Sequence, residues 1–494
     1  MKLLSGRLPL WHDLQMTGVI QFLLNGAMRR VTEITPAMTV LQYLREREAM
    51  IGTKEGCAEG DCGACTVVVC RVEDGRPIYQ AVNSCLLLLP QLDGAAVFTV
   101  EGLIDQGGEL HPVQQALLEN DGTQCGFCTP GFVMSMAAFQ QSGEPATEDH
   151  IHEMLSGNLC RCTGYRSIVA ACHRLAADTS DAARAPLLTS ASALETLPSC
   201  ADYRDGNMIF LAPRSLAELA EVAAQHPQAQ FLAGGTDLGL LFSKHRKQQP
   251  TALISTSRVT ELKRIAVEAD AIEFGGAVTY TEALPYLDEH LPQFADLVRR
   301  IGSRQIRNLG TIAGNLANAS PIGDTPPCLI ALEAVLTLRS ASGTRTVPTE
   351  SFITGYRKTV LQPGEFIEAI RVPRLRPNQQ FFAYKISKRF DQDISTTIGA
   401  FRLEVKNSIV RDLRAVFGGM AAQPARAAFA EKAVSGRLWT AETLAGIDAE
   451  VARDFSPIDD HRGSAAYRLR AAANLFRRLQ LETTVACPVR LELL

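Results

Sequence analysis

Residues 55–69, EGCAEGDCGACTVVV, decide the fold of the N-terminal part of this chain. Together with one further cysteine, after nineteen intervening residues, they follow the C-x4-C-x2-C spacing of plant-type [2Fe-2S] ligands. The cysteines of this first constellation are Cys57, Cys62, Cys65 and Cys85. Zinc motifs usually pair C-x2-C with a second two-ligand unit, which is missing from this spacing. A zinc site and buried free thiols are the alternatives to a cluster.

The glycines of this segment fit the same interpretation. A loop that folds over two irons must turn backbone N–H groups toward the sulfurs, and Gly56, Gly60 and Gly63 permit the positive φ values that this requires. The sequence before the loop reads as a strand hairpin over residues 19–34 and a short helix, and a second hairpin follows the loop. This order predicts a β-grasp ferredoxin domain.

A second constellation lies in a stretch with helical periodicity, which begins near residue 100. Four helices are predicted, with starts at Pro112, Pro130, Thr147 and Ser167. A C-x2-C pair, Cys125 and Cys128, lies between the first two helices, and a C-x-C pair, Cys160 and Cys162, lies between the last two. The short C-x-C bite strains a tetrahedral zinc site, whereas each pair can hold one iron of a two-iron cluster. A compact bundle would bring both pairs to one end.

Two glycine-rich segments further along are candidates for a flavin nucleotide site. Residues 230–237, QFLAGGTD, place two glycines directly after a strand, where N–H groups form a nest for a pyrophosphate. Residues 304–324 are rich in Gly, Asn and small side chains that can lie close to a flat ring. A plain loop with a helix start is the alternative for the second segment. The chain has no G-x-G-x-x-G motif, which disfavours a Rossmann dinucleotide site.

These segments together resemble the molybdenum hydroxylase family, which includes xanthine dehydrogenase, aldehyde oxidase and carbon monoxide dehydrogenase. Residues 123–135, TQCGFCTPGFVMS, and 155–168, LSGNLCRCTGYRSI, look like its second ferredoxin-type domain. The glycine-rich segments look like its vanillyl-alcohol-oxidase-type FAD domain. The resemblance covers residues 16–494 and implies two [2Fe-2S] clusters and one FAD.

The resemblance also implies which residues contact FAD. The pyrophosphate and ribose would lie against Gln230, Phe231, Leu232, Ala233, Gly234, Gly235, Thr236 and Asp237. The rest of the cofactor would lie against Thr311, Ile312, Ala313, Gly314, Asn315, Asp324, Ile367 and Lys385. Ile301 stands where vertebrate relatives have an aromatic residue near the flavin. Residues 389–393 correspond to a mobile acidic loop, with a solvated charge run as the alternative, and Tyr356 corresponds to a position near the nicotinamide pocket.

The predicted fold class is α+β multidomain. The expected order is a plant-type ferredoxin domain over residues 16–98, a four-helix [2Fe-2S] domain over 99–178, a linker over 179–205, an FAD-binding domain over 206–377 and a C-terminal flavoprotein domain over 378–494. Long alternating strands after residue 378, followed by helices, predict that the last domain is a three-stranded sheet packed by helices.

The composition and the apolar patterning indicate which partners and which compartment to expect. Lys and Arg number 49 against 53 Asp and Glu, so the net charge of −4 gives no reason to expect nucleic acid. No apolar run approaches the roughly 18 residues that span a bilayer, and the N-terminus lacks the apolar stretch of a signal peptide. We therefore expect a cytoplasmic chain, without a membrane and without disulfides. Its first fifteen residues are expected to be a disordered tail or the result of an upstream start choice. The cysteines expected to be buried small side chains are Cys70, Cys172, Cys200, Cys328 and Cys487.

The order of domains implies a role in electron transfer, with no catalytic residue expected on this chain. Iron-sulfur and flavin parts without a molybdopterin region match the small subunits of bacterial two-subunit members of the family. The resemblance implies a molybdopterin-binding large subunit in an α2β2 heterotetramer, which hydroxylates hypoxanthine and xanthine. Electrons would pass through the Cys125 cluster, the Cys57 cluster and FAD to NAD+. The alternatives are the same role beside an aldehyde or N-heterocycle hydroxylase, and a stand-alone NAD(P)H-dependent iron-sulfur flavoprotein reductase.

Overall fold

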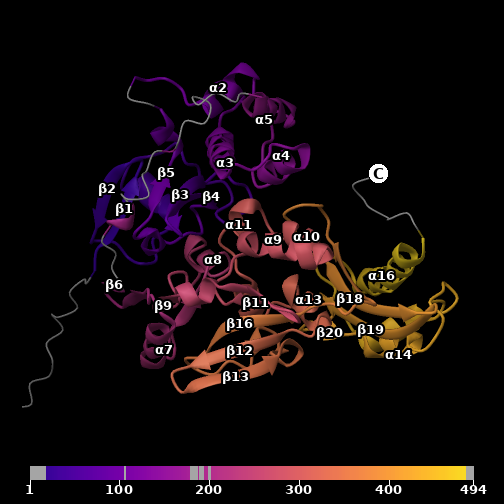
Figure 1. The fold of residues 1–494 in the computed structure, drawn as a ribbon. Coiled ribbons are helices and arrows are strands. Elements are labelled where there is room, and N and C mark those ends of the chain that lie inside the picture. The colour runs from indigo at the N-terminus through magenta and orange to yellow at the C-terminus, as the bar shows by residue number, and fades with distance from the viewer. Residues whose placement is uncertain (1–17, 105–106, 178–186, 188–193, 198–201, 486–494) are drawn as a thin grey trace, which may run out of the picture. The chain divides into compact units, whose positions relative to one another are not determined.

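The computed structural model describes residues 18–104, 107–177, 187, 194–197 and 202–485 (Figure 1). The chain divides into two compact units. The first comprises the described residues up to Arg214 together with Gln228–Arg258, and the second comprises Ser215–Pro227 and the described residues from Val259 onward. The N-terminal tail, Cys200, Cys487 and most of the expected linker lie outside the described residues.

The first unit opens with a five-stranded mixed sheet in the order β2-β1-β5-β3-β4. Its strands are β1 Ile20–Leu24, β2 Ala27–Val31, β3 Thr66–Glu73, β4 Arg76–Asn83 and β5 Ala96–Phe98. Strand β1 pairs antiparallel with β2 and parallel with β5. Helix α1, Val40–Glu46, begins at Thr39, whose hydroxyl accepts the backbone N–H of Gln42 in a capping box. The first cysteine loop connects α1 to β3.

The four helices predicted after residue 100 are confirmed. They are α2 Pro112–Glu119, α3 Thr129–Ser142, α4 Glu148–Leu155 and α5 Arg166–Ala177. Prolines occupy the first turns of α2 and α3, where a missing N–H costs nothing, and Gly143 ends α3 at φ 70°. Val68 and Phe98 of the sheet share one apolar core with Phe132 and Ile151 of the helices. The helices and the first sheet therefore form one packed body.

A four-stranded sheet completes the first unit, in the order β6-β7-β9-β8. Its strands are β6 Asp202–Asp205, β7 Met208–Leu211, β8 Gln230–Leu232 and β9 Ala252–Ser255. Strand β6 occupies the last four residues of the expected linker. Tyr203 in β6 donates its hydroxyl to the carbonyl oxygen of Ile34, 2.5 Å away, and accepts the N–H of the same residue. Helix α8, Gly239–Ser243, follows β8.

The second unit contains a five-stranded antiparallel sheet in the order β10-β11-β16-β12-β13. Its strands are β10 Ile265–Val267, β11 Ala271–Gly275, β12 Val335–Ser340, β13 Gly343–Pro348 and β16 Phe366–Pro373. The helices of this part are α7 Leu216–Gln225, α9 Tyr280–His290, α10 Pro292–Arg299, α11 Arg304–Arg307, α12 Ile312–Ala317 and α13 Thr325–Ala331. A small hairpin joins β14 Ile353–Gly355 to β15 Lys358–Thr359. One apolar core runs from this sheet to the helices.

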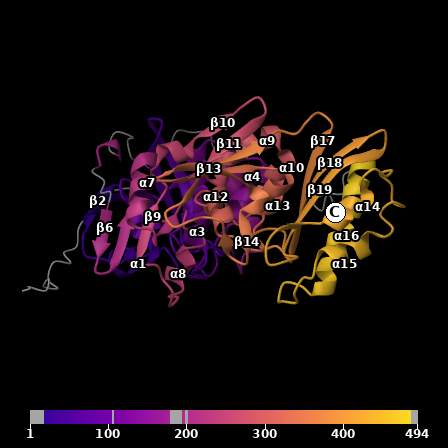
Figure 2. The ribbon, with the colours of Figure 1, turned by 90° about the horizontal axis from the view of Figure 1, so that it is seen from below.

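The C-terminal sheet has four strands, so the predicted count of three is wrong by one. The strands are β17 Gln379–Ile386, β18 Thr397–Lys406, β19 Ile409–Gly418 and β20 Ala425–Arg426. Strand β20 has two residues, too few for an alternating pattern to show in the sequence. Helices α14 Ala428–Val434, α15 Ile447–Asp454 and α16 Ala465–Thr484 lie alongside this sheet (Figure 2). Among the described residues, no helix is both long enough and apolar enough to cross a bilayer.

Candidate functional site

The thiols of the first constellation lie as two hydrogen-bonded pairs: Cys57 with Cys62, and Cys65 with Cys85. The backbone N–H groups of Glu59 and Asp61 donate to the sulfur of Cys57, at 3.4 and 3.3 Å. The hydrogen bond with Cys62 is the largest cause that lowers the pKa of Cys57, to about 5, with burial opposing it and the N–H groups adding to it. This hydrogen bond favours the thiolate at Cys57, which is the form that binds iron, and it raises the pKa of its partner Cys62.

The glycines of this loop have two different structural roles: two adopt a positive φ, and one leaves space for a neighbouring sulfur. Gly60 and Gly63 have φ values of 83° and 66°, as expected. Gly56 is not among the positive-φ glycines, so the role predicted for it is wrong. A Cβ at Gly56 would lie 2.7 Å from the sulfur of Cys62. This glycine therefore leaves room for a ligand sulfur instead of permitting an unusual φ.

The thiols of the second constellation pair as Cys125 with Cys162 and Cys128 with Cys160. These pairs run across the C-x2-C and C-x-C motifs, and the arrangement in which each motif holds one iron stays a prediction. Cys125 and Cys162 are exposed, whereas Cys128 and Cys160 are half-buried. Burial is the main cause that raises the pKa of the Cys128 thiol, to about 12.

In the part of the chain that the structure describes, no three or more His, Cys, Asp or Glu side chains gather where they could hold one metal ion. Cys70, Cys172 and Cys328 are buried outside the constellations, which confirms that expectation for these three.

The two cysteine loops contact each other directly. The N–H of Leu159, next to Cys160, donates to the carbonyl oxygen of Cys62 over 2.9 Å. The buried side chain of Asn158 donates to the carbonyl oxygen of Gly63 over 3.0 Å and accepts the hydroxyl of Ser135 over 2.7 Å. The sequence analysis did not single out Asn158, although it lies within the motif segment LSGNLCRC. No sequence signal within that segment distinguishes Asn158, because its contacts with Gly63 and Ser135 depend on the fold.

Substitution of Gly63 tests this contact. We expect Gly63→Ala to lower both the thermal unfolding midpoint and the iron content, because the new Cβ would lie 2.2 Å from the carbonyl oxygen of Gly157. Overpacking costs about 1–3 kcal/mol, in addition to about 1–2 kcal/mol for a left-handed residue with a Cβ. Gly75→Ala is the matched control, since Gly75 has φ 73° with no atom within 4 Å of its Cβ position. Equal losses in both variants would show that the packing of the loops contributes nothing.

The first glycine-rich segment, residues 230–237, lies in the first unit, where β8 ends in a tight turn that leads to α8. Gly235 has φ 75°, and its carbonyl oxygen accepts the N–H of Gly239 over 2.6 Å. A Cβ at Gly235 would approach Leu232 to 3.2 Å and the Gln91 side chain to 3.4 Å. A strand, a glycine turn and a helix start are the backbone geometry that a pyrophosphate nest needs.

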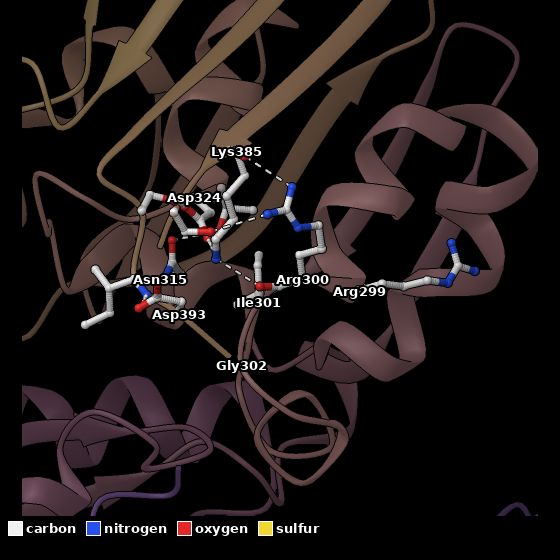
Figure 3. Close-up of polar contacts among 12 residues, drawn as sticks. Arg299, Arg300, Ile301, Gly302, Asn315, Asp324, Lys385 and Asp393 are labelled. Atoms are coloured by element: carbon white, nitrogen blue, oxygen red, sulfur yellow. Dashed lines mark hydrogen bonds and ion pairs between the residues drawn. The ribbon is translucent and has the colours of Figure 1, made fainter. Parts of the chain in front are cut away.

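The second segment, residues 304–324, lies in the second unit. Its last residue, Asp324, forms a buried ion pair with Lys385 of strand β17. The ammonium group of Lys385 lies 2.7 Å from a carboxylate oxygen of Asp324, and both side chains are buried (Figure 3). Ser395 donates its hydroxyl to the other carboxylate oxygen over 2.5 Å. Lys385 also donates to the carbonyl oxygen of Arg300 over 2.9 Å. A carboxylate held this way has a fixed orientation, as a contact for cofactor hydroxyl groups requires.

Thr325, the residue after Asp324, is part of a chain of hydrogen-bonded hydroxyl and amide groups. The side-chain oxygen of Asn315 accepts the hydroxyl of Thr325 over 2.7 Å, and the hydroxyl of Tyr280 is 2.7 Å from that of Thr325. Thr311 begins α12, and its hydroxyl accepts the N–H of Gly314 over 2.9 Å. The sequence analysis missed Ser395, Thr325 and Tyr280. Thr325 follows Asp324 in the chain but has no motif of its own, and only the fold brings Ser395 to Asp324 and Tyr280 to Thr325.

The turn that carries Ile301 is fixed by two arginines. The guanidinium of the fully buried Arg307 donates to the carbonyl oxygens of Arg299, Ile301 and Gly302 at 2.8, 3.3 and 3.0 Å. Arg300 donates to the carbonyl oxygen of Lys385 over 3.2 Å. Figure 3 shows this turn beside the Asp324 and Lys385 side chains. In contrast, Ile367 lies in strand β16 with its side chain in the apolar core.

Two loops complete the second unit's candidate residues. In the loop 389–393, the carboxylate of Asp393 accepts the N–H groups of Arg389 and Ile394 over 2.9 and 3.0 Å. Burial opposes these hydrogen bonds, but they keep the pKa of Asp393 below its usual value. Tyr356 is 63% exposed at the turn between β14 and β15. Arg357 anchors that turn by donating to the side chain of Asn318, just after α12.

Comparisons with known families match four successive parts of the chain. Residues 22–89 match the "2Fe-2S iron-sulfur cluster binding domain", and residues 99–173 match the "[2Fe-2S] binding domain". Residues 204–375 match the "FAD binding domain in molybdopterin dehydrogenase", and residues 382–483 match the "CO dehydrogenase flavoprotein C-terminal domain". Two [2Fe-2S]-binding domains and an FAD-binding domain are therefore present.

The similar proteins include xanthine dehydrogenases, an aldehyde oxidase and carbon monoxide dehydrogenases. Xanthine dehydrogenase of Drosophila subobscura is 33% identical over 82% of this chain, and aldehyde oxidase 2 of Cavia porcellus is 30% identical over 86%. The chain spans only 35% and 37% of the length of these two relatives. A solved chain of carbon monoxide dehydrogenase from Hydrogenophaga pseudoflava matches 56% of this chain and 96% of its own length, with 29% identity and a TM-score of 0.53. These matches support the assignment of this chain to the molybdenum hydroxylase family.

Proposed function

We propose, from the match of its domains to the molybdenum hydroxylase family, that this chain is the electron-transfer subunit of a bacterial xanthine dehydrogenase. In this proposal the first sheet is a β-grasp ferredoxin domain, the helices α2 to α5 form the second cluster domain, and the flavin part is of the vanillyl-alcohol-oxidase type. The domain boundaries are those predicted from the sequence. The mixed order β2-β1-β5-β3-β4 around a cysteine loop supports the first assignment.

The observation that carries the proposal is the direct contact between the two cysteine loops. The hydrogen bond from Leu159 to Cys62 joins a residue adjacent to one ligand set with a ligand of the other. Cys125 and Cys162 are exposed, whereas Cys65 and Cys85 are buried. Cys57 and Cys62 are half-buried, so the second constellation offers the more exposed thiols to an external electron donor. This supports the order of carriers in which the Cys125 cluster precedes the Cys57 cluster.

The flavin supplies the change from one-electron to two-electron chemistry, because an iron-sulfur cluster passes one electron at a time whereas NAD+ accepts a hydride. The residues of this chain would hold it in two ways. The turn at Gly234 and Gly235 would bind the pyrophosphate, and Asp324, fixed by Lys385 and Ser395, would accept hydrogen bonds from cofactor hydroxyl groups. The other residues assigned to the cofactor remain predictions from the resemblance.

The remaining parts of the proposal concern what lies outside this chain. The partner would be a molybdopterin-binding large subunit that oxidises hypoxanthine and xanthine, in an α2β2 heterotetramer in the cytoplasm. The matches to xanthine dehydrogenases over most of this chain support a purine substrate. The match to an aldehyde oxidase at 30% identity makes the same role beside an aldehyde hydroxylase the second candidate.

The isolated chain tests the proposed role. We expect it to oxidise NADH with an artificial dye and to leave hypoxanthine and xanthine unchanged, because its domains match cluster-binding and flavin-binding families. Dye reduction and purine consumption are both followed by absorbance. Addition of the large subunit is expected to produce NAD+ reduction by purines. Purine oxidation by the isolated chain would overturn the electron-transfer role, and an aldehyde that replaces purines in the complex would favour the second candidate.

A further inference from the structure

Helix α8 connects the glycine turn of the flavin segment to the first cysteine loop within one compact unit. At the start of α8, a Cβ on Gly239 would lie 2.4 Å from the carbonyl oxygen of Leu86, so the helix lies directly on the backbone next to Cys85. At its end, the hydroxyl of Ser243 donates to the carbonyl oxygen of Ala58 over 2.8 Å. This helix of five residues therefore contacts the segment next to Cys85 at its start and the first cysteine loop at its end.

Lys244, which ends α8, brings a positive charge to the loop. Its ammonium group donates to the carbonyl oxygen of Cys57, a ligand residue, and lies 3.3 Å from the carboxylate of Glu59. The side chain of Lys244 is 32% exposed, so solvent screens its charge only in part. A surface lysine placed for solubility alone would not bond to the backbone of a metal ligand.

Reduction adds one negative charge to a cluster that is already anionic through its thiolates. A cation held beside the ligand loop stabilises the reduced form more than the oxidised form, and this raises the reduction potential. Glu59 has the opposite effect, and Lys244 partly neutralises it. The balance of these two side chains therefore sets part of the cluster potential.

We propose that Lys244 is a positioning residue that raises the reduction potential of the Cys57 cluster and ties it to the flavin segment. The inference rests on the proposed electron-transfer function. One electron would arrive from the Cys125 cluster and leave to the flavin, so the Cys57 cluster must accept it readily. The positive charge of Lys244 favours reduction of this cluster. Lys244 lies at the end of α8, the helix that begins just after the flavin turn.

A redox titration of the full chain, with EPR detection of each reduced cluster, tests this proposal. Lys244→Met keeps most of the side-chain length but removes the charge, and it leaves Glu59 without its cation. We expect the equilibrium constant for reduction of the Cys57 cluster to fall about tenfold, which is a shift of about 59 mV to lower potential. Glu59→Gln is expected to shift the same potential in the opposite direction, and Lys244→Arg to keep it within twofold.

Lys247→Met is the matched control, because Lys247 is exposed three residues further along and its loss changes the net charge equally. The Cys125 cluster signal in the same sample provides an internal reference. Equal shifts in Lys244→Met and Lys247→Met would overturn the proposal. Loss of the Cys57 cluster from Lys244→Met would also overturn it, since Lys244 would then be a structural residue of the loop. A wild-type chain without two cluster signals would instead refute the proposed function.

Discussion

Cys128→Ser is expected to lower the iron content of the chain from about four irons to about two and to abolish one of two reduced-cluster EPR signals. Cys128 pairs with Cys160, and a serine oxygen is a poor replacement for a thiolate that would bind one iron as a terminal ligand. The flavin should remain bound, because the glycine turn and the Asp324 site lie outside the second constellation. Iron and flavin per chain, together with the EPR spectrum, provide the measurement.

The packing of the structure sharpens this expectation. The cysteine loops are joined by the Leu159 contact, and the helices share a core with the first sheet, so the remaining signal is expected to broaden or shift without disappearing. Cys172→Ser is the matched control: Cys172 is buried in α5, outside both constellations, and should keep about four irons. One equivalent of zinc with only two irons in the wild-type chain would refute the second cluster.

Lys385→Met is expected to destabilise the second unit by about 3–5 kcal/mol, because it leaves the buried carboxylate of Asp324 without its cation. Asp324→Asn should be similarly costly, since it leaves a buried ammonium group. Flavin affinity should fall in both variants, because the orientation of residue 324 depends on this pair. Urea unfolding of the flavin domain and a flavin titration provide the two readouts.

A double variant, Asp324→Leu with Lys385→Met, separates the charge effect from loss of packing. Replacing both members of a buried pair with apolar side chains is often neutral, so the double variant should be more stable than either single one while still binding flavin poorly. Arg477→Met is the control: it removes the exposed ion pair with Asp448 and should cost about 0–1 kcal/mol. A single-variant loss as small as this control would mean that the buried pair has no structural importance.

Local sequence patterns predicted the cofactor domains and most of the secondary structure. Cysteine spacing over nine residues reflects how far one loop reaches around two irons, and this geometry does not depend on the rest of the chain. The helices after residue 100 were predictable because Pro112, Pro130 and Thr147 mark the starts of the first three, and because apolar residues recur at helical spacing in α2 and α4. The two-residue strand β20 lay below the length at which such patterns exist.

The sequence by itself determined which side chains are the candidate metal ligands and which segments carry glycine turns, because these features follow from spacing and backbone freedom within single loops. Only the tertiary structure decided how the thiols pair across the C-x2-C and C-x-C motifs, and that Gly56 makes room for the Cys62 sulfur. It also decided that Lys385 neutralises Asp324, 61 residues away, and that Lys244 reaches the carbonyl of Cys57, 187 residues away. Contacts between distant segments depend on how strands pair and how cores close, and no local periodicity encodes that choice.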